Sequence, residues 1–303
     1  MQRYKSPKDL PKEDLWEGGH PLCSGCPASL GLRNALKVLG KNTVVINASG
    51  CLTLAAVYPY TPLKVPWIHS AIENAGSTAL GIWSAYKRLG KKVNILCYAG
   101  DGATYDIGFQ SLSHAIEKGC DFIYICYNNQ CFANTGVQES TATPYGAFTN
   151  TSPPGKKNRI GSVIDRKPLA KIIAAHEIPY VATASCGFQI DFMNKVKKAS
   201  EVRGPAFIDY FSTCQPGWGV DPSKTLEVGR LAVETGAWPL FEIENGEFRL
   251  TYTREELKPL KEYLKYQRRF AHLRDKDIKE IEERIRREWE ELKKGNFWTA
   301  HYV

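Results

Sequence analysis

The sequence predicts an α/β fold in which helices cover both faces of a doubly wound, mostly parallel sheet. From Pro21 to about Cys214, short apolar runs alternate with amphipathic segments of helical length. Parallel strands need a crossover connection, which is usually a helix, so this alternation is typical of a parallel sheet. The apolar runs are rich in β-branched and aromatic residues and are bounded by Gly, Asn or Asp, as expected of buried strands.

Five strands and five helices follow from this pattern. The strands are expected at residues 43–47, 93–98, 122–127, 181–184 and 206–210. The helices are expected at residues 30–39, 71–89, 108–118, 168–176 and 188–200. A segment rich in Thr, Ser, Gly and Pro runs from residue 134 to about 165, and loops of this length are generally functional or disordered.

The two ends of the chain have a different character from this region. Residues 1–20 are charged, carry two prolines and are expected to form an N-terminal arm, which leaves residues 21–253 as the α/β domain. Residues 254–303 hold 14 Lys/Arg and 11 Asp/Glu at helical spacing, which predicts a charged helical extension. We expect this helix to be solvated, with a partner-clasping or electron-acceptor docking helix as the alternative.

Composition excludes several classes of protein. The 303 residues are 43% hydrophobic and 24% charged, which is enough for a core and rules out general disorder. No apolar run approaches the roughly 18 residues of a membrane span, and the N-terminus lacks the apolar core of a secretory signal. The net charge of +8 lies mostly outside the extension, so no nucleic-acid-binding tail is indicated. Nine cysteines without an export signal favour a reducing, cytoplasmic location with metal or redox roles for some of them.

Two polar clusters follow consecutive predicted strands. Gly100, Asp101 and Gly102 come directly after one strand, and Asn128 and Asn129 come after the next. The carboxyl ends of parallel strands are where open α/β sheets bind ligands. Carboxylate and amide oxygens suit Mg²⁺, and glycines allow backbone N–H groups to approach phosphates. The spacing therefore predicts a diphosphate cofactor held through Mg²⁺, whereas a lone Gly-Asp-Gly would indicate only a turn.

Four cysteines form a second constellation: Cys23, Cys26, Cys51 and Cys214. Four thiolates at such positions are able to hold a structural zinc ion or a [4Fe–4S] cluster, and the spacing does not separate the two. Small buried side chains are the third alternative. The remaining cysteines lie in strand-like or helix-end contexts and are expected to be buried core residues: Cys97, Cys120, Cys126, Cys131 and Cys186.

These motifs resemble those of a known family. The run GDGATYDIGFQSLSHAIEKGCDFIYICYNNQCFANTG contains a thiamine-diphosphate-type motif. With the TPYGA that follows, it resembles the β subunit of 2-oxoacid:ferredoxin oxidoreductases of the pyruvate type. The resemblance extends to IENAG, AAHEIPYVATAS and GPAFIDYFSTC, and covers nearly the whole chain from about Gly19. It implies a sheet of the thiamine-diphosphate-binding type.

The resemblance implies roles for individual residues. Asp101, the Asn129 side chain and the Cys131 main-chain carbonyl are expected to bind Mg²⁺, and Asn134 is expected to be catalytic, facing the substrate and the reactive carbon of thiamine. Cofactor contacts are expected from Gly100, Asp101, Gly102, Ala103, Asn129, Cys131, Thr135, Gly136, Cys51 and Glu73. The resemblance also implies a [4Fe–4S] cluster on Cys23, Cys26, Cys51 and Cys214. In the family the residue after Cys26 is usually glycine; here it is Pro27.

Other polar residues are less informative. Glu73 either contacts the cofactor or caps a helix. His114 and His176 are expected to pack or to face solvent, because neither is paired with a carboxylate at catalytic spacing. His69 lies just before IENAG, near the predicted active edge, and both a packing and a site role stay open.

The resemblance implies oxidative decarboxylation of a short 2-oxoacid, with pyruvate as the favoured substrate. Coenzyme A would be the acyl acceptor and ferredoxin the electron acceptor. The chain lacks cysteines for further clusters, so α and γ/δ-type subunits are expected as partners, the α subunit supplying the glutamate that activates thiamine. The run Cys131-Phe132-Ala133 and the later Val137 depart from the common pyruvate pattern, which keeps oxalate or a branched 2-oxoacid open as substrates. A thiamine enzyme without iron and a zinc-stapled, non-catalytic scaffold are the alternatives of other classes.

Overall fold

The computed structural model describes residues 3–299 and has an eight-stranded mixed sheet at its centre. The strand order is β2-β1-β3-β4-β6-β5-β7-β8, with parallel pairing from β2 to β5 and antiparallel pairing of β7 with β5 and β8. The strands are β1 Thr43–Ala48, β2 Trp67–Ser70, β3 Asn94–Gly100, β4 Ile123–Asn128, β5 Tyr180–Ser185, β6 Ala206–Phe211, β7 Phe241–Glu244 and β8 Glu247–Leu250.

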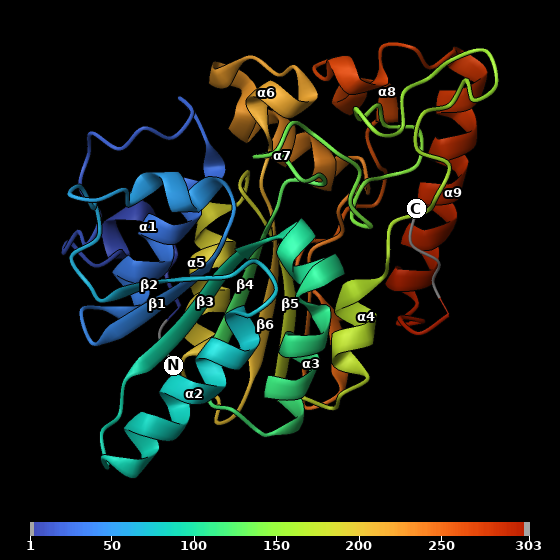
Figure 1. Ribbon diagram of the computed structural model, residues 1–303. Helices are drawn as coiled ribbons and strands as arrows, with labels where there is room; N and C mark the ends of the chain where they lie inside the picture. The colour runs from blue at the N-terminus through green and yellow to red at the C-terminus, as the bar shows by residue number, and fades with distance from the viewer. Residues whose placement is uncertain (1–2, 300–303) are drawn as a thin grey trace.

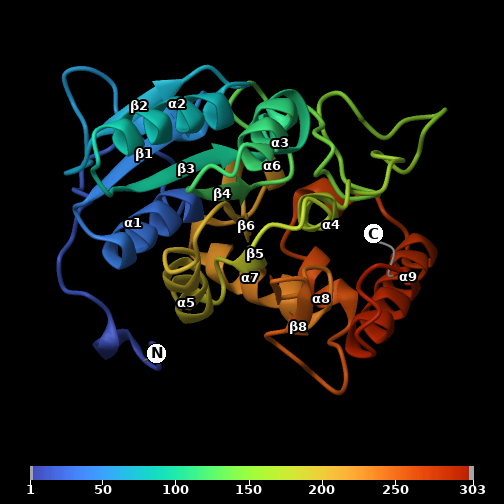
Figure 2. The same cartoon turned by 90° about the horizontal axis from the view of Figure 1, so that it is seen from below.

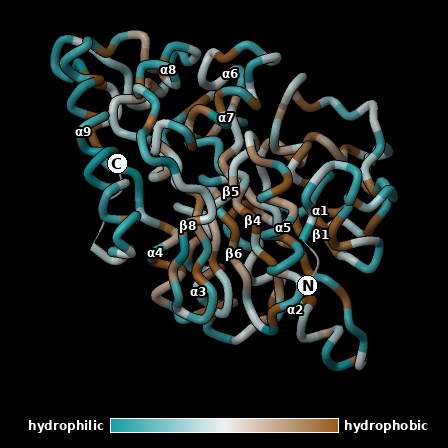
Figure 3. Tube along the Cα trace, turned by 180° about the vertical axis from the view of Figure 1, so that it is seen from behind, coloured by the Kyte–Doolittle hydropathy of each residue, from teal (hydrophilic) through white to brown (hydrophobic). Residues whose placement is uncertain are grey.

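Helices lie on both faces of this sheet, as Figure 2 shows, so the predicted α/β class is confirmed. The helices are α1 Pro27–Leu39, α2 Ala75–Arg88, α3 Phe109–Glu117, α4 Leu169–Ala174, α5 Gln189–Ala199, α6 Gln215–Trp218, α7 Thr225–Glu234, α8 Leu260–Leu264 and α9 Asp275–Lys293. One hydrophobic core lies under α1, α5 and α7, and a second lies under α2, α3 and α4. Hydrophobic residues accordingly concentrate along the central strands, as Figure 3 shows.

The five predicted strands and five predicted helices are all present, with boundaries shifted by a few residues. The structure also contains short helical turns, which are η1 Pro7–Asp9, η2 Cys51–Ala55, η3 Gly102–Ile107, η4 Pro222–Lys224 and η5 Arg268–Phe270. Of these, η3 is π-helical. The segment 134–165 contains no helix or strand, in agreement with the predicted loop.

Three strands were not predicted. β2 has only four residues and begins just after a proline, so its pattern is too short to recognise. β7 and β8 form a hairpin through Asn245 and Gly246, which both have positive φ angles of 52° and 85°. Asn-Gly between two apolar-polar alternations is a strong hairpin signal, so the sequence did contain the information for this pair.

The C-terminal extension is more closely packed than a solvated helix. Ile281, Ile285, Trp289 and Leu292 are buried on one face of α9. Arg159 and Arg284 pair with Asp277 and Asp165, which joins α9 to the long loop beside it in Figure 1. The prediction of a solvated helix was therefore wrong. Charges on the exposed face masked an apolar stripe at helical spacing.

At the other end of the chain, Leu15 and Trp16 are buried, and Trp16 forms a β-bridge with Leu63. No helix among residues 3–299 is long and apolar enough to cross a membrane.

Candidate functional site

Asp101 and Asn129 meet at the carboxyl edge of the sheet. Asp101 follows β3 and Asn129 follows β4, which are adjacent parallel strands. The Asp101 carboxylate is fully buried and accepts hydrogen bonds from the Ser140 hydroxyl (2.5 Å) and the Asn129 main-chain N–H (3.1 Å). Parallel pairing of consecutive strands therefore brings the two polar clusters together, as the sequence predicts.

Two oxygen atoms lie within hydrogen-bond distance of the Asn129 side-chain amide. Its amide nitrogen donates to Asp101 Oδ1 at 3.0 Å and to the main-chain carbonyl oxygen of Cys131 at 2.8 Å, in the orientation that satisfies both neighbours. Rotation of this amide by half a turn presents its oxygen to the same point. Three oxygen atoms, from Asp101, Asn129 and Cys131, then face one position. Such a set of oxygen ligands suits a hard divalent cation.

Burial makes the ionised form of Asp101 costly. Desolvation raises the pKa of Asp101 to about 7, even though the hydrogen bonds from Ser140 and Asn129 act to lower it. A buried carboxylate with a raised pKa is able to bind a cation with a gain in free energy, because the cation restores the solvation that burial removed.

A cavity of about 180 Å³ lies over this point. It is lined by most of the predicted site residues, namely Cys51, Gly100, Asp101, Gly102, Ala103, Asn129, Cys131, Asn134 and Thr135. Asn134, Thr135 and Gly136 are exposed in this chain, so the mouth of the cavity is formed by the turn that follows Phe132. Gly136 has a φ angle of 113° and is not part of the lining.

Glycine at position 102 is required by close packing. A Cβ atom there would lie 2.3 Å from the Phe132 ring, well inside van der Waals contact. The Phe132 ring therefore covers the start of the helical turn after Asp101. Because Phe132 also lines the cavity, its contact with Gly102 fixes one wall of the site.

The four predicted cysteines come from three separate segments. Cys23 and Cys26 precede α1, where Cys26 is the N-cap residue; Cys51 begins η2 after β1; and Cys214 is the N-cap residue of α6 after β6. Burial raises the pKa of Cys51 to about 12, and the neighbouring thiols of Cys214, Cys26 and Cys23 raise it further.

The four thiols differ in exposure. Cys23 is exposed, Cys26 and Cys51 are partly exposed and Cys214 is buried. The Gly217 N–H donates to the Cys214 sulfur at 3.3 Å. Among residues 3–299, no three His, Cys, Asp or Glu side chains are arranged closely enough to hold a single metal ion.

Two features near the cysteines were not predicted from the sequence. The carbonyl of Cys131 was expected at the Mg²⁺ site and its thiol in the core, but that thiol lies beside Cys214 and lowers the pKa of Cys214. The Tyr127 side chain is buried, its hydroxyl has no hydrogen-bond partner, and it lines the cavity. A Cβ on Gly50 would lie 2.8 Å from this hydroxyl, so Tyr127 reaches the residue next to Cys51. No sequence signal distinguishes Tyr127 from a strand tyrosine of the core.

Glu73 and His69 lie outside the cavity lining. The Glu73 main-chain carbonyl accepts from the Ser111 hydroxyl at 2.6 Å, and Asn74, not Glu73, is the N-cap residue of α2. His69 Nε2 lies 2.6 Å from the hydroxyl oxygen of Ser49, which does line the cavity. His176 packs between the Ser113 hydroxyl and the Ile172 carbonyl, in agreement with its expected packing role.

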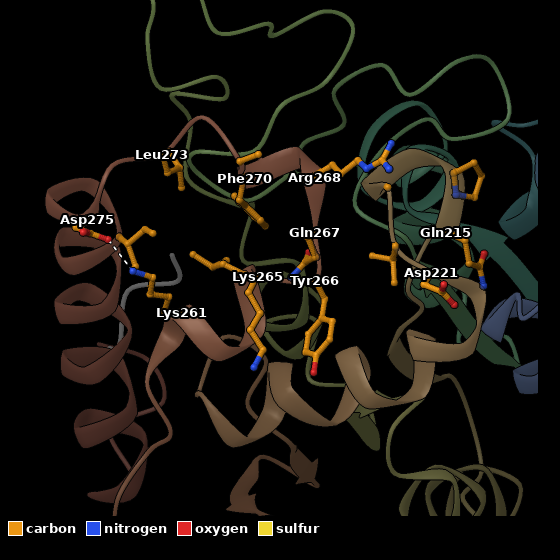
Figure 4. Close-up of a pocket in the computed structure, with 16 residues that line it drawn as sticks. Gln215, Asp221, Lys261, Lys265, Tyr266, Gln267, Arg268, Phe270, Leu273 and Asp275 are labelled. Atoms are coloured by element: carbon orange, nitrogen blue, oxygen red, sulfur yellow. Dashed lines mark hydrogen bonds and ion pairs between the residues drawn. The ribbon is translucent and has the colours of Figure 1, made fainter.

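A larger cavity of about 940 Å³ lies between α6, α8 and α9, as Figure 4 shows. Its walls include Gln215, Lys261, Lys265 and Arg268 but none of the predicted site residues. Volume alone therefore does not identify the chemical site of this chain.

Comparisons with known proteins agree with this geometry. The family described as thiamine pyrophosphate enzyme, C-terminal TPP binding domain, matches residues 48–210. The chain is 50% identical to pyruvate synthase subunit PorB of Methanothermobacter marburgensis, over 94% of this chain and 99% of that protein. It is 42% identical to ketoisovalerate oxidoreductase subunit VorB of Pyrococcus abyssi, over 94% of each.

Among solved structures, the fold is similar to 2-oxoglutarate:ferredoxin oxidoreductase from Magnetococcus marinus. The TM-score is 0.57 at 20% identity, over 75% of this chain and 82% of that chain. On the strength of its sequence relatives and its matched domain, this chain belongs to the thiamine-diphosphate-binding β subunits of the 2-oxoacid:ferredoxin oxidoreductase family.

Proposed function

We propose that this chain binds thiamine diphosphate, Mg²⁺ and one [4Fe–4S] cluster. As one subunit of a complex, it would take part in the oxidative decarboxylation of a short 2-oxoacid, with pyruvate as the favoured substrate. The observation that carries the proposal is the convergence of the Asp101 carboxylate, the Asn129 amide and the Cys131 carbonyl at a cavity that Cys51 also lines. Relatives named pyruvate synthase subunit PorB, 50% and 51% identical to this chain, support pyruvate as the substrate.

The oxygen donors fit Mg²⁺ with a diphosphate. Asp101 would supply one carboxylate oxygen, Asn129 its amide oxygen after rotation, and Cys131 its carbonyl, which leaves coordination positions for phosphate oxygens. Ser140 holds the second oxygen of Asp101, so the carboxylate keeps one fixed orientation. Thiamine supplies, when bound, the carbanion that attacks the keto carbon and accepts the electrons left by decarboxylation.

The chain's own residues would orient the substrate and exclude water. Phe132 and Ile72 form apolar parts of the cavity wall, and Asn134 is at its mouth. We propose that the Asn134 amide donates a hydrogen bond to the substrate. Asn134 is exposed here, which suits a site that a second subunit completes.

The family to which this chain belongs favours an iron–sulfur cluster over a zinc ion on these cysteines. Cluster sulfurs are tuned by hydrogen bonds from backbone N–H groups, and the Gly217 N–H already points at Cys214. The unpartnered Tyr127 hydroxyl beside Gly50 is a second donor available to a bound group. Cys23, Cys26, Cys51 and Cys214 would hold the cluster, next to the cavity that would hold thiamine. All nine cysteines are free thiols, which suits a reducing cytoplasm.

The chain has too few cysteines to hold further iron–sulfur clusters, so we infer that it works with partner subunits. After these four cysteines, the remaining cysteines offer no further set of cluster ligands. We therefore propose α and γ/δ-type subunits, the latter with further clusters that pass electrons to ferredoxin. The glutamate that activates thiamine would come from the α subunit. The isolated chain should accordingly bind its cofactors but fail to turn over pyruvate, and turnover by this chain alone would contradict the proposal.

The substrate is best tested directly. The complex should reduce a dye acceptor with pyruvate in the presence of coenzyme A. Oxalate, 2-oxoglutarate and 2-oxoisovalerate are the comparison substrates, each with and without coenzyme A. Fastest reduction with 2-oxoisovalerate would favour the second candidate, a branched 2-oxoacid, which the 42% identity to VorB supports. Reduction by oxalate without coenzyme A would identify an oxalate-oxidising enzyme.

A further inference from the structure

Arg269 is a buried cation supplied by the C-terminal extension. It belongs to η5, and its side chain is 3% exposed. Arg268, its neighbour in the chain, is exposed and lines the large cavity of Figure 4. Two adjacent arginines thus occupy opposite environments, one facing solvent and one facing the interior beside α6.

The partners of Arg269 are all uncharged. Its guanidinium donates to Gln130 Oε1 at 2.7 Å, to Gln267 Oε1 at 3.0 Å and to the Tyr263 hydroxyl at 3.4 Å. Its central carbon also lies 3.6 Å from the centre of the Trp218 ring. No carboxylate of residues 3–299 forms an ion pair with it. A buried charge without a counter-ion is costly, so the fold keeps this cation at a penalty.

The residues around Arg269 contact both the proposed Mg²⁺ site and the proposed cluster site. Trp218 is one helical turn after Cys214, and its main-chain N–H donates to the Cys214 carbonyl at 3.0 Å. The Trp218 indole N–H donates to the Asn129 carbonyl at 2.9 Å. Gln130, the hydrogen-bond partner of Arg269, lies between Asn129 and Cys131 in the chain. The guanidinium therefore lies between the segment that begins at Cys214 and the turn from Asn129 to Cys131.

We propose that Arg269 is the built-in counter-charge of the iron–sulfur cluster and raises its reduction potential. This inference rests on the proposed function, because it requires a cluster on Cys23, Cys26, Cys51 and Cys214. A cluster held by four thiolates carries net negative charge, which grows by one when the cluster is reduced. A fixed positive charge nearby stabilises the reduced state more than the oxidised state. Arg269 thus acts on electron transfer only through the positive charge that it places near the cluster.

The test is a redox titration of the full chain, purified anaerobically and monitored by electron paramagnetic resonance. In Arg269→Gln we expect the ratio of reduced to oxidised cluster, at the wild-type midpoint, to fall about tenfold, which is about 59 mV for one electron. Arg269→Lys keeps the charge and should recover most of the shift. Arg268→Gln removes the adjacent, exposed charge and is the matched control, with no expected shift beyond the repeat error.

A second variant covers the case in which Arg269→Gln does not fold. Gln130→Glu has nearly the same shape and places a carboxylate against the guanidinium, so it cancels the charge with Arg269 still in place. It should lower the midpoint in the same direction. A midpoint unchanged in a folded variant with wild-type iron content would overturn the inference. A wild-type chain without iron and sulfide would instead contradict the proposed function, so the two failures are distinguishable.

Discussion

The oxygen-donor site and the cysteine site lie side by side but are built differently. Asp101 and Asn129 follow two paired strands, and Asp101 is fully buried and tied to Ser140 before any ligand binds. The cysteines come from the loop before α1, the turn after β1 and the start of α6, and Cys23 is exposed.

The difference shows which site the fold forms by itself. Sheet pairing determines where the oxygen donors lie, so this site is largely preorganised. Only part of the cysteine site is fixed in this way, because Cys51 and Cys214 come shortly after β1 and β6, whereas Cys23 and Cys26 follow no strand. A bound cluster would supply the remaining constraint, as metal sites do when binding is coupled to local folding.

The largest effect is expected at the preorganised site. Asp101→Asn removes the charge that would bind Mg²⁺ but keeps the shape of the side chain. We expect the affinity for thiamine diphosphate with Mg²⁺ to fall about 100-fold or more, measured by calorimetry. Asp106→Asn is the matched control, because Asp106 accepts hydrogen bonds from Thr141 instead and should leave the affinity unchanged. Equal losses in both variants would contradict the assignment.

The second prediction concerns the exposed cysteine. Cys23→Ala should lose most of the iron, while the free energy of unfolding without a cluster changes by less than about 0.5 kcal/mol, because Cys23 is exposed. Cys186→Ala is the contrasting control: Cys186 is buried in the core, so the variant should be less stable by about 1 kcal/mol but keep its iron. Iron content at the wild-type level in Cys23→Ala would show that Cys23 is not a ligand of the cluster.

The third prediction is a pH dependence. Burial raises the pKa of Asp101 from the ordinary value of 3.8 to about 7. Between these values the folded chain keeps a proton that the unfolded chain has lost. The contribution of Asp101 to the free energy of unfolding therefore falls as the pH rises from about 4 to 7, in the absence of Mg²⁺.

Chemical denaturation at pH 5 and pH 7.5 checks this sign. The decrease should be smaller in Asp101→Asn, and Mg²⁺ with thiamine diphosphate should reverse it in the wild type by binding the ionised form. The same pH dependence in Asp101→Asn and in the wild type would show that Asp101 is not its source.

The smallest effect is expected at the boundary between the two sites. Tyr127→Phe removes a buried hydroxyl that has no partner, so the chain without ligands should become more stable by about 1 kcal/mol. With cluster and cofactor bound this gain should disappear, because the Tyr127 hydroxyl would then donate to the bound group a hydrogen bond that phenylalanine does not form. Thermal unfolding of both forms measures the reversal. Tyr124→Phe on the same strand contacts Thr104 instead and should show no such reversal.

Much of the fold and of the oxygen-donor site was predictable because both depend on local patterns. Buried strands and the polar residues that end them are visible in sequence, and the adjacency of β3 and β4 follows from the usual order of parallel strands. The apolar face of α9 and the hairpin of β7 and β8 were also present in the sequence, but charge interleaving and short strand length concealed them.

Contacts between distant segments were not predictable in the same way. Ser140 reaches Asp101 from the middle of a long loop, and Arg269 reaches Gln130 across 139 positions of sequence. Neither residue belongs to a motif, because its position depends on how a loop or a terminal extension folds back onto the sheet. Such contacts become visible only in three dimensions.

Metal analysis of the chain, purified alone under anaerobic conditions, decides whether Cys23, Cys26, Cys51 and Cys214 hold an iron–sulfur cluster. We predict a brown protein with a broad absorbance shoulder at about 400 nm and about four iron and four sulfide per chain. Replacement of Cys214 with Ala should remove this absorbance and spare the binding of Mg²⁺ and thiamine diphosphate. A colourless wild-type protein with one zinc ion per chain would contradict the account.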